Sequence, residues 1–178
     1  MSTTYFKTKQ AGFSLVETLI YLTLMVFFFA VIVNNLIVIT RTHRGLAVLR
    51  EMEQSAITGL DRLTREIRAA AIILSAQSTL GSHPGVLTLS VRDDSTGNYD
   101  TVRFSLDDGA LVLTKNSVVQ GDLTSTKISV TNLIFTEISA ASSTAVKIEM
   151  QLQATSSDEV KTENFYHTVI LRESYFDM

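Results

Sequence analysis

An apolar stretch from Phe13 to Ile39 limits what this chain can fold into more than any other feature. It holds 21 apolar side chains among 27 residues, and Glu17 is its only charged residue. About 20 apolar residues in a helix are enough to cross the hydrocarbon core of a bilayer. The 18 Leu, Ile, Phe and Val side chains each favour insertion by about 0.3–0.6 kcal/mol, which outweighs the cost of roughly 3 kcal/mol for the carboxylate. The sequence therefore predicts a transmembrane helix segment over residues 13–39.

The residues before the apolar stretch have the character of a leader peptide. Residues 1–12 are polar, contain Lys7 and Lys9, and include no acidic side chain, which suits the cytoplasmic flank of an inserted helix. An ordinary secretory signal fits poorly, because its apolar region spans only about 7–15 residues and ends at a small-residue cleavage site. We therefore expect the leader to precede the apolar run.

After Ile39 the composition becomes charged, yet apolar residues recur every three or four positions, which is typical of an amphipathic helix. These residues are Leu49, Met52, Ala56, Leu60, Leu63, Ile67, Ala70 and Leu74. Asp61 and Arg65 on the polar face have the i,i+4 spacing that stabilises a helix. We predict an amphipathic helix extension over residues 40–75, continuous with the membrane segment.

Residues 76–178 have the pattern of a globular β-rich domain, with short alternating runs separated by turn residues. The predicted strands are Val86–Val91, Tyr99–Leu106, Ala110–Thr114, Lys127–Ile138, Ala145–Ala154 and Thr162–Arg172. Asp107-Asp108-Gly109 predicts a tight hairpin turn, because Asp and Gly tolerate positive φ. The expected fold class is α+β: a long N-terminal helix packed on a small, mostly antiparallel β-sheet domain.

Composition and spacing argue against several classes of function. The net charge is −3, so no basic surface for nucleic acid is expected. The chain has no cysteine, which excludes disulfides and thiol chemistry. His43, His83 and His167 form no metal-binding motif, and we interpret them as structural or surface residues. We expect no catalytic residues and no cofactor, because no hydrolase elbow or phosphate-binding loop is present.

Several loop aspartates raise the question of a calcium site, since hard cations prefer oxygen ligands. These are Asp93, Asp94, Asp100, Asp107 and Asp108, and their spacing forms no known calcium loop. Asp is also favoured in solvent-exposed turns. We predict that these residues belong to turns and that no metal is bound.

The segment that opens the apolar run is the most informative motif. It reads Gly12-Phe13-Ser14-Leu15-Val16-Glu17-Thr18-Leu19-Ile20 and directly follows the basic leader. This segment resembles the processing and methylation site of type IV prepilins and pseudopilins. The resemblance implies that a membrane aspartyl peptidase, the prepilin peptidase, cleaves between Gly12 and Phe13 and methylates the new amine.

A carboxylate inside a lipid-facing helix is rare unless it has a partner or a task, so Glu17 needs a cation. The resemblance implies that this cation is the free amine of Phe13 in an adjacent subunit, so that both residues serve assembly. The alternative is a plain signal-anchor in which Glu17 reaches the membrane interface. Asn34 and Asn35 also have two interpretations: a place where the helix unwinds on assembly, or residues at the far interface, which we favour.

The resemblance implies a structural subunit of a type IV pilus or type II secretion-like filament, first held as a single-pass protein in the inner membrane. Its partners would be other pilin or pseudopilin subunits, the prepilin peptidase, inner-membrane assembly machinery and lipid. Asn132-Leu133-Ile134-Phe135 and the strand ending at Arg172 resemble minor subunits of the PulJ or PilW kind. The absence of cysteine and of a proline in the apolar helix also favours a minor subunit. The alternative function is a membrane-anchored adhesion or binding module.

Overall fold

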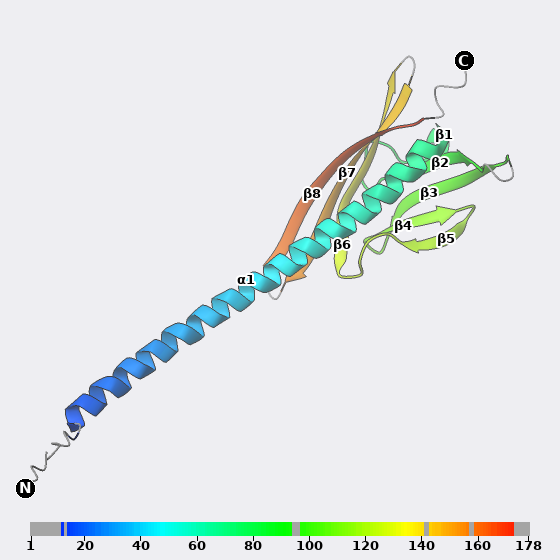
Figure 1. Cartoon of the computed structure of the whole chain (residues 1–178). Coiled ribbons are helices and arrows are strands. Elements are labelled where there is room, and N and C mark those ends of the chain that lie inside the picture. The colour runs from blue at the N-terminus through cyan, green and yellow to red at the C-terminus, as the bar shows by residue number, and fades with distance from the viewer. Residues whose placement is uncertain (1–11, 13, 94–96, 141–142, 157–158, 173–178) are drawn as a thin grey trace, which may run out of the picture. The chain divides into compact units, whose positions relative to one another are not determined.

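The computed structural model describes residues 12, 14–93, 97–140, 143–156 and 159–172 of the chain. The predicted leader therefore lies outside the described residues except for Gly12, and so does Phe13. The described part has the expected α+β fold, with one long helix, α1 (Leu15–Ala69), and antiparallel β-sheets (Figure 1). Two compact units divide the chain at His43, so that residues 44–178 contain the end of α1 and all the strands.

The strands form two antiparallel sheets. The first sheet has the order β1-β2-β3-β4-β5 and the second the order β6-β7-β8. The elements of the first sheet are β1 (Ala70–Ile73), β2 (Leu87–Arg92), β3 (Tyr99–Asp107), β4 (Ala110–Lys115) and β5 (Val118–Asp122), with a 3₁₀ helix η1 (Ser75–Gln77) after β1. Those of the second are β6 (Ile128–Ala140), β7 (Ser143–Ser156) and β8 (Glu159–Ile170). Each of the six predicted strands corresponds to one of these elements.

The amphipathic part of α1 buries one stripe of side chains in the core of residues 44–178. The buried residues are Met52, Ser55, Ala56, Gly59, Leu63 and Ile67, which recur every three or four positions. They belong to one hydrophobic cluster with strands of both sheets, including Phe104 of β3 and Phe135 of β6. The predicted apolar stripe is thus confirmed, and it is the surface on which both sheets pack.

The helix ends at Ala69, earlier than residue 75, where the predicted helix extension ends. Ala70–Ile73 instead form β1, which pairs with β2 through Ala70↔Val91 and Ile73↔Leu89. Ala70 follows the buried Ile67 by three residues, as in a helix, so the spacing of apolar residues did not reveal the change from helix to strand. The β-branched Ile72 and Ile73 favour an extended backbone when a neighbouring strand is available. Tertiary pairing therefore overrides the continuing helical pattern.

Two hairpin turns connect β3, β4 and β5 of the first sheet. Asp108 and Gly109, with φ of 46° and 76°, join β3 to β4, because Asp107 pairs with Ala110. Two consecutive positive φ angles define a type I′ turn, so the predicted hairpin is confirmed. Asn116 and Ser117, with φ of 48° and 68°, make an equivalent turn from β4 to β5. We did not predict β5, because its side chains are mostly exposed and show no alternation.

A β-bulge keeps the second sheet in register with the core. Val130 pairs with Leu152 and Leu133 pairs with Met150, with the irregularity between them. All four side chains are buried although Val130 and Leu133 are three residues apart. Without the bulge, strand alternation would direct one of the two to solvent.

The free edge of β6 is covered by the loop that carries the only proline of the chain. The Gly85 N–H donates to Leu133 O (2.8 Å), the Leu133 N–H donates to His83 Nδ1 (3.0 Å), and the Gly81 N–H donates to Phe135 O (2.7 Å). Further along β6, the Val130 N–H donates to Gly109 O in the β3–β4 turn (2.7 Å). These bonds satisfy an edge that would otherwise offer unpaired groups. His83 therefore has a structural role.

Gly85→Ala should lower the free energy of unfolding by about 1–3 kcal/mol, the usual cost of overpacking. A Cβ at this position would lie 2.8 Å from Leu133 O and 3.1 Å from the Phe135 ring. Gly45→Ala is the matched control, because its Cβ would meet nothing within 4 Å and alanine favours the helix by up to about 1 kcal/mol. Denaturant unfolding of the detergent-solubilised chain measures both. Equal stability of Gly85→Ala and the wild type would contradict the close approach.

Candidate functional site

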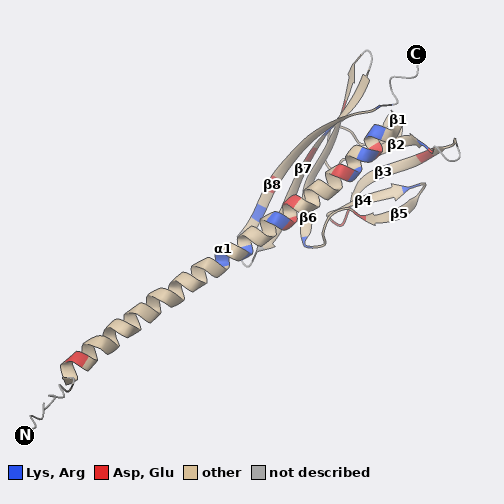
Figure 2. Ribbon diagram, in the orientation of Figure 1, with Lys and Arg blue, Asp and Glu red and all other residues tan. Residues whose placement is uncertain are grey.

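The candidate site lies in the first turns of α1, which open the apolar segment. Glu17 is the third residue of this helix and its only acidic residue in the first turn, where the helix dipole favours a negative charge. No other charged residue occurs between Phe13 and Thr40. Figure 2 shows this as one acidic patch near the start of α1, followed by a long uncharged stretch.

Glu17 has a neutral hydrogen-bond partner on its own helix. The Tyr21 hydroxyl donates to Glu17 Oε1 at 3.3 Å, and the glutamate is half-buried against the helix. Among the residues that the structure describes, no basic side chain forms an ion pair with Glu17. The hydroxyl satisfies part of the carboxylate but does not neutralise it. Sequence reasoning missed Tyr21, although its i,i+4 spacing from Glu17 was a signal for it.

The proposed cleavage junction lies immediately before the helix. The Thr18 N–H donates to Ser14 O at 3.1 Å, and the Thr18 hydroxyl donates to Leu15 O at 2.8 Å, so the helical turn begins directly after Ser14. Gly12 is exposed and non-helical. Phe13, the other residue of the predicted junction, is outside the described residues. An exposed glycine outside regular structure is accessible backbone for a peptidase.

The side chains around the helix in this segment are exposed rather than packed. Every large apolar side chain from Leu15 to Ile39 is at least 43% exposed. By length and composition, α1 is able to cross a membrane. An exposed apolar surface of this size is suited to contact lipid or other apolar helices.

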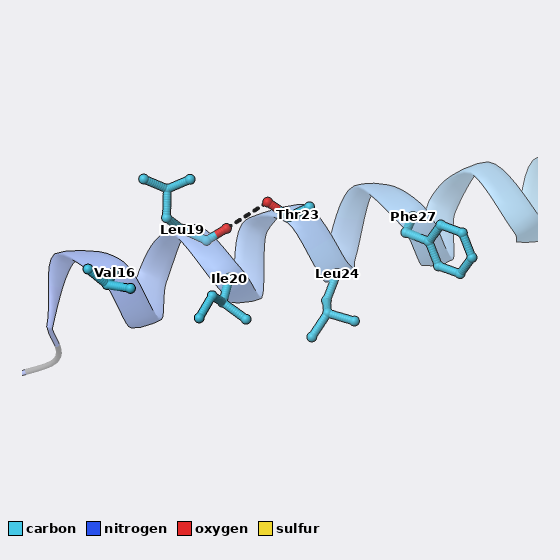
Figure 3. A pocket seen from close by; sticks show the side chains of 6 residues that line it. All are labelled: Val16, Leu19, Ile20, Thr23, Leu24 and Phe27. Atoms are coloured by element: carbon cyan, nitrogen blue, oxygen red, sulfur yellow. Dashed lines mark hydrogen bonds between the residues drawn. The ribbon is translucent and has the colours of Figure 1, made fainter.

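One face of this segment forms a shallow apolar groove. It is lined by Val16, Leu19, Ile20, Thr23, Leu24 and Phe27 (Figure 3). Its one hydroxyl, that of Thr23, donates to Leu19 O at 2.8 Å. The groove therefore presents apolar surface and a satisfied threonine, which suits an acyl chain or another helix.

Asp100, which was predicted to lie in a turn, lies instead in β3 and has structural partners there. Asp100 accepts from Asn116 Nδ2 at 2.7 Å and forms an ion pair with Lys115 Nζ at 2.8 Å. The Asn116 hydrogen bond and then the Lys115 ammonium hold the pKa of Asp100 below its usual value, and Asp100 raises the pKa of Lys115. Asp107 is the last residue of β3 and Asp108 lies in the β3–β4 turn, while Asp94 lies outside the described residues. No three His, Asp or Glu side chains gather at a metal-binding distance within the described ranges.

The histidines are distributed rather than clustered. His167 Nε2 lies 3.1 Å from the Thr64 hydroxyl, which links β8 to α1. His83 contacts β6 as described above, and His43 is exposed on α1. None of them lies near Glu17 in the sequence. Comparison of the chain with protein-family models, characterised proteins and solved structures found no match.

Glu17→Leu should insert into a membrane at least as well as the wild type, with a gain of up to about 3 kcal/mol. The carboxylate costs insertion energy and has no cation among the described residues. The fraction of chain resistant to alkaline extraction from membranes measures the effect. Ile32→Glu, which adds a carboxylate well inside the segment, should reduce that fraction. A loss of insertion in Glu17→Leu would show instead that Glu17 helps to hold the helix in the membrane.

Proposed function

We propose that this protein is a structural subunit, and specifically a minor pilin or pseudopilin, of a type IV pilus or type II secretion-like filament. One observation supports the proposal most strongly. Glu17 is the only charge in an exposed apolar helix segment, and its partner on the described chain is neutral. A charge in this environment indicates a functional task. Its task is to select the position of a neighbouring subunit.

Cleavage between Gly12 and Phe13 supplies the missing cation. Hydrolysis of this peptide bond leaves an α-amine on Phe13, which is mostly protonated at neutral pH because its usual pKa is about 7.7–8.0. Phe13 precedes Glu17 by only four residues in the sequence. In neighbouring parallel helices with a small axial offset, the amine and the carboxylate reach the same depth.

The ion pair between the Phe13 amine and the Glu17 carboxylate favours correct assembly because an unpaired charge in an apolar environment is costly. Removing one partner of a buried ion pair typically costs about 3–5 kcal/mol, whereas the complete pair is close to neutral compared with apolar residues. Subunits placed in the wrong axial position leave two unpaired charges in an apolar environment. The correct register is therefore favoured by excluding the alternatives, and the mechanism is assembly rather than catalytic turnover.

The folded domain leaves the first segment of α1 out of its core, which supports a separate role for that segment in assembly. Residues 44–178 form a unit with its own core, made from one stripe of α1 and both sheets. The first segment of α1 is thus available for contacts with lipid or other helices. In the proposed pathway the chain first resides as a single-pass protein in the inner membrane and then enters a cell-envelope or surface filament.

A membrane-anchored adhesion or binding module is the second candidate, and the independent core of residues 44–178 favours it. In that case the helix only positions the domain. Substitutions in the first turns of α1 that preserve insertion would then leave ligand binding unchanged. The filament proposal predicts instead that substitution of Glu17 impairs function even when the helix still inserts into the membrane.

The mature N-terminus offers a direct test of processing. Mass spectrometry of the chain recovered from membranes should find N-methyl-Phe13 as its first residue. Gly12→Val should block this processing, because a β-branched side chain would replace the glycine at the cleavage junction. Recovery of the wild-type chain with residues 1–12 still attached, in cells that contain the peptidase, would contradict the proposal.

The role of Glu17 in assembly requires a separate test. Glu17→Ala should reduce incorporation into filaments at least tenfold, while cleavage after Gly12 continues. The tenfold loss corresponds to about 1.4 kcal/mol and is a lower bound for the unpaired amine. Quantitative immunoblotting of sheared filaments measures incorporation. Glu53→Ala, which removes an exposed acidic side chain from the same helix, is the control and should assemble normally; normal assembly of Glu17→Ala would remove the proposed role of the charge.

A further inference from the structure

Six positions in the first part of α1 form a seam with coiled-coil spacing. Val16, Ile20, Thr23, Phe27, Ala30 and Asn34 follow one another in alternating steps of four and three residues. This alternation averages 3.5 residues and places the six side chains on one face of the helix. All six are exposed, and the first four line the apolar groove in Figure 3.

Asn34, like its neighbour Asn35, differs from the threonines of the helix, and it is Asn34 that falls on the seam. The hydroxyls of Thr23 and Thr40 donate to the carbonyl oxygens of Leu19 and Leu36, each at 2.8 Å. By contrast, the Asn34 carboxamide has no hydrogen-bond partner among the residues that the structure describes. Four apolar residues, Leu36–Ile39, follow the asparagine pair, so the amide lies within the apolar run, in contrast to the far-interface interpretation favoured from the sequence. An amide in hydrocarbon is costly unless another group satisfies it.

We infer that this seam pairs two copies of the chain in the membrane as parallel helices, with the two Asn34 carboxamides hydrogen-bonded to each other. A carboxamide carries both a donor and an acceptor, so an identical group satisfies it. A two-fold axis parallel to the helices places Asn34 of both copies at the same depth. Asparagine side chains form such bonds between membrane helices, and an asparagine in a heptad seam fixes the register of the pair.

The other seam residues suit a close approach of two helices. Thr23 and Ala30 are small, which allows the backbones to come near each other. The Thr23 hydroxyl is already bonded within its own helix, so its contribution to the seam is apolar. Val16, Ile20 and Phe27 provide the larger side chains that fill the space between helices. The expected geometry is a left-handed crossing at about 20°.

The seam and the Glu17 face are distinct, so both are able to act at once. Asn35 follows Glu17 by 18 residues, which is five turns at 3.6 residues per turn, and therefore shares its face. Asn34 is offset from that face by about 100°. The inferred dimer depends on membrane insertion but not on cleavage or on filament assembly. Asn35 also provides a matched control beside the residue under test.

Disulfide cross-linking is a direct test, because the chain has no native cysteine. The purified full-length chain is reconstituted in lipid vesicles at low density, and insertion of each variant is checked by alkaline extraction. Ala30→Cys, on the seam, should cross-link to a dimer, whereas Ile32→Cys on the opposite side of the helix should cross-link at least fivefold less. In the Ala30→Cys background, Asn34→Leu should reduce the dimer yield about three- to tenfold, and Asn35→Leu should leave it unchanged.

Three results would overturn the inference: equal cross-linking of Ala30→Cys and Ile32→Cys, equal effects of Asn34→Leu and Asn35→Leu, or a chain that does not insert. Equal effects of the two asparagine variants would place both amides in the polar interface. Adding Glu17→Ala to Ala30→Cys should leave the dimer yield unchanged, although the same substitution is expected to block filament incorporation. Failure of the dimer and failure of the proposed filament function are therefore distinguishable.

Discussion

The structure depends on one helix whose two parts meet different environments. From Leu15 to Ile39 the apolar side chains surround the helix and none of the large ones is buried. From Met52 onward most apolar residues lie in one stripe, and this stripe is buried among strands of both sheets. An all-round apolar surface requires an apolar environment, whereas a stripe requires a folded partner on one side. The change in pattern therefore separates the part of α1 that joins the folded domain from the part that is left for lipid or for other helices.

Most of the fold was predictable because burial leaves a period in the sequence. β7 alternates buried Val146, Ile148, Met150, Leu152 and Ala154 with half-exposed residues, and its strand pattern was correctly predicted. The stripe of α1 and the Asp108-Gly109 turn were predictable for equally local reasons. β1 and β5 were not predictable in this way. Ala70 has helical spacing but extended backbone imposed by β2, and Val118–Asp122 are held by pairing with β4 rather than by burial. Long-range pairing leaves little trace in a single sequence.

The candidate site was predictable to a similar extent. Glu17 was identifiable because a lone carboxylate in an apolar run is a local anomaly, and the structure places it half-buried with Tyr21 as a neutral partner. Tyr21 was missed because an aromatic residue in such a run looks apolar. The role of His83 was also not predictable, since its acceptor nitrogen meets an amide 50 residues away in the sequence. The bulge between Val130 and Asn132 had no sequence signature of its own, although it determines which side chains of β6 reach the core.

The polar residues of the apolar segment differ in how many of their hydrogen-bonding groups and charges have a partner on the described chain. The threonines bond the carbonyl group three or four residues earlier, so they add little cost in lipid. Glu17 accepts one hydrogen bond from Tyr21 and keeps its charge uncompensated, whereas Asn34, like Asn35, has no partner among the described residues. The fewer partners a polar group has on its own chain, the more it needs a partner from another molecule. A charge is satisfied by an opposite charge, such as the proposed amine, while a carboxamide is satisfied by a second carboxamide. Because Glu17 and Asn34 lie on different faces and differ in chemistry, a partner that satisfies one of them does not satisfy the other. The proposed assembly therefore gives this helix two separable contacts, one that depends on the proposed processing at Gly12 and one that depends only on a second helix.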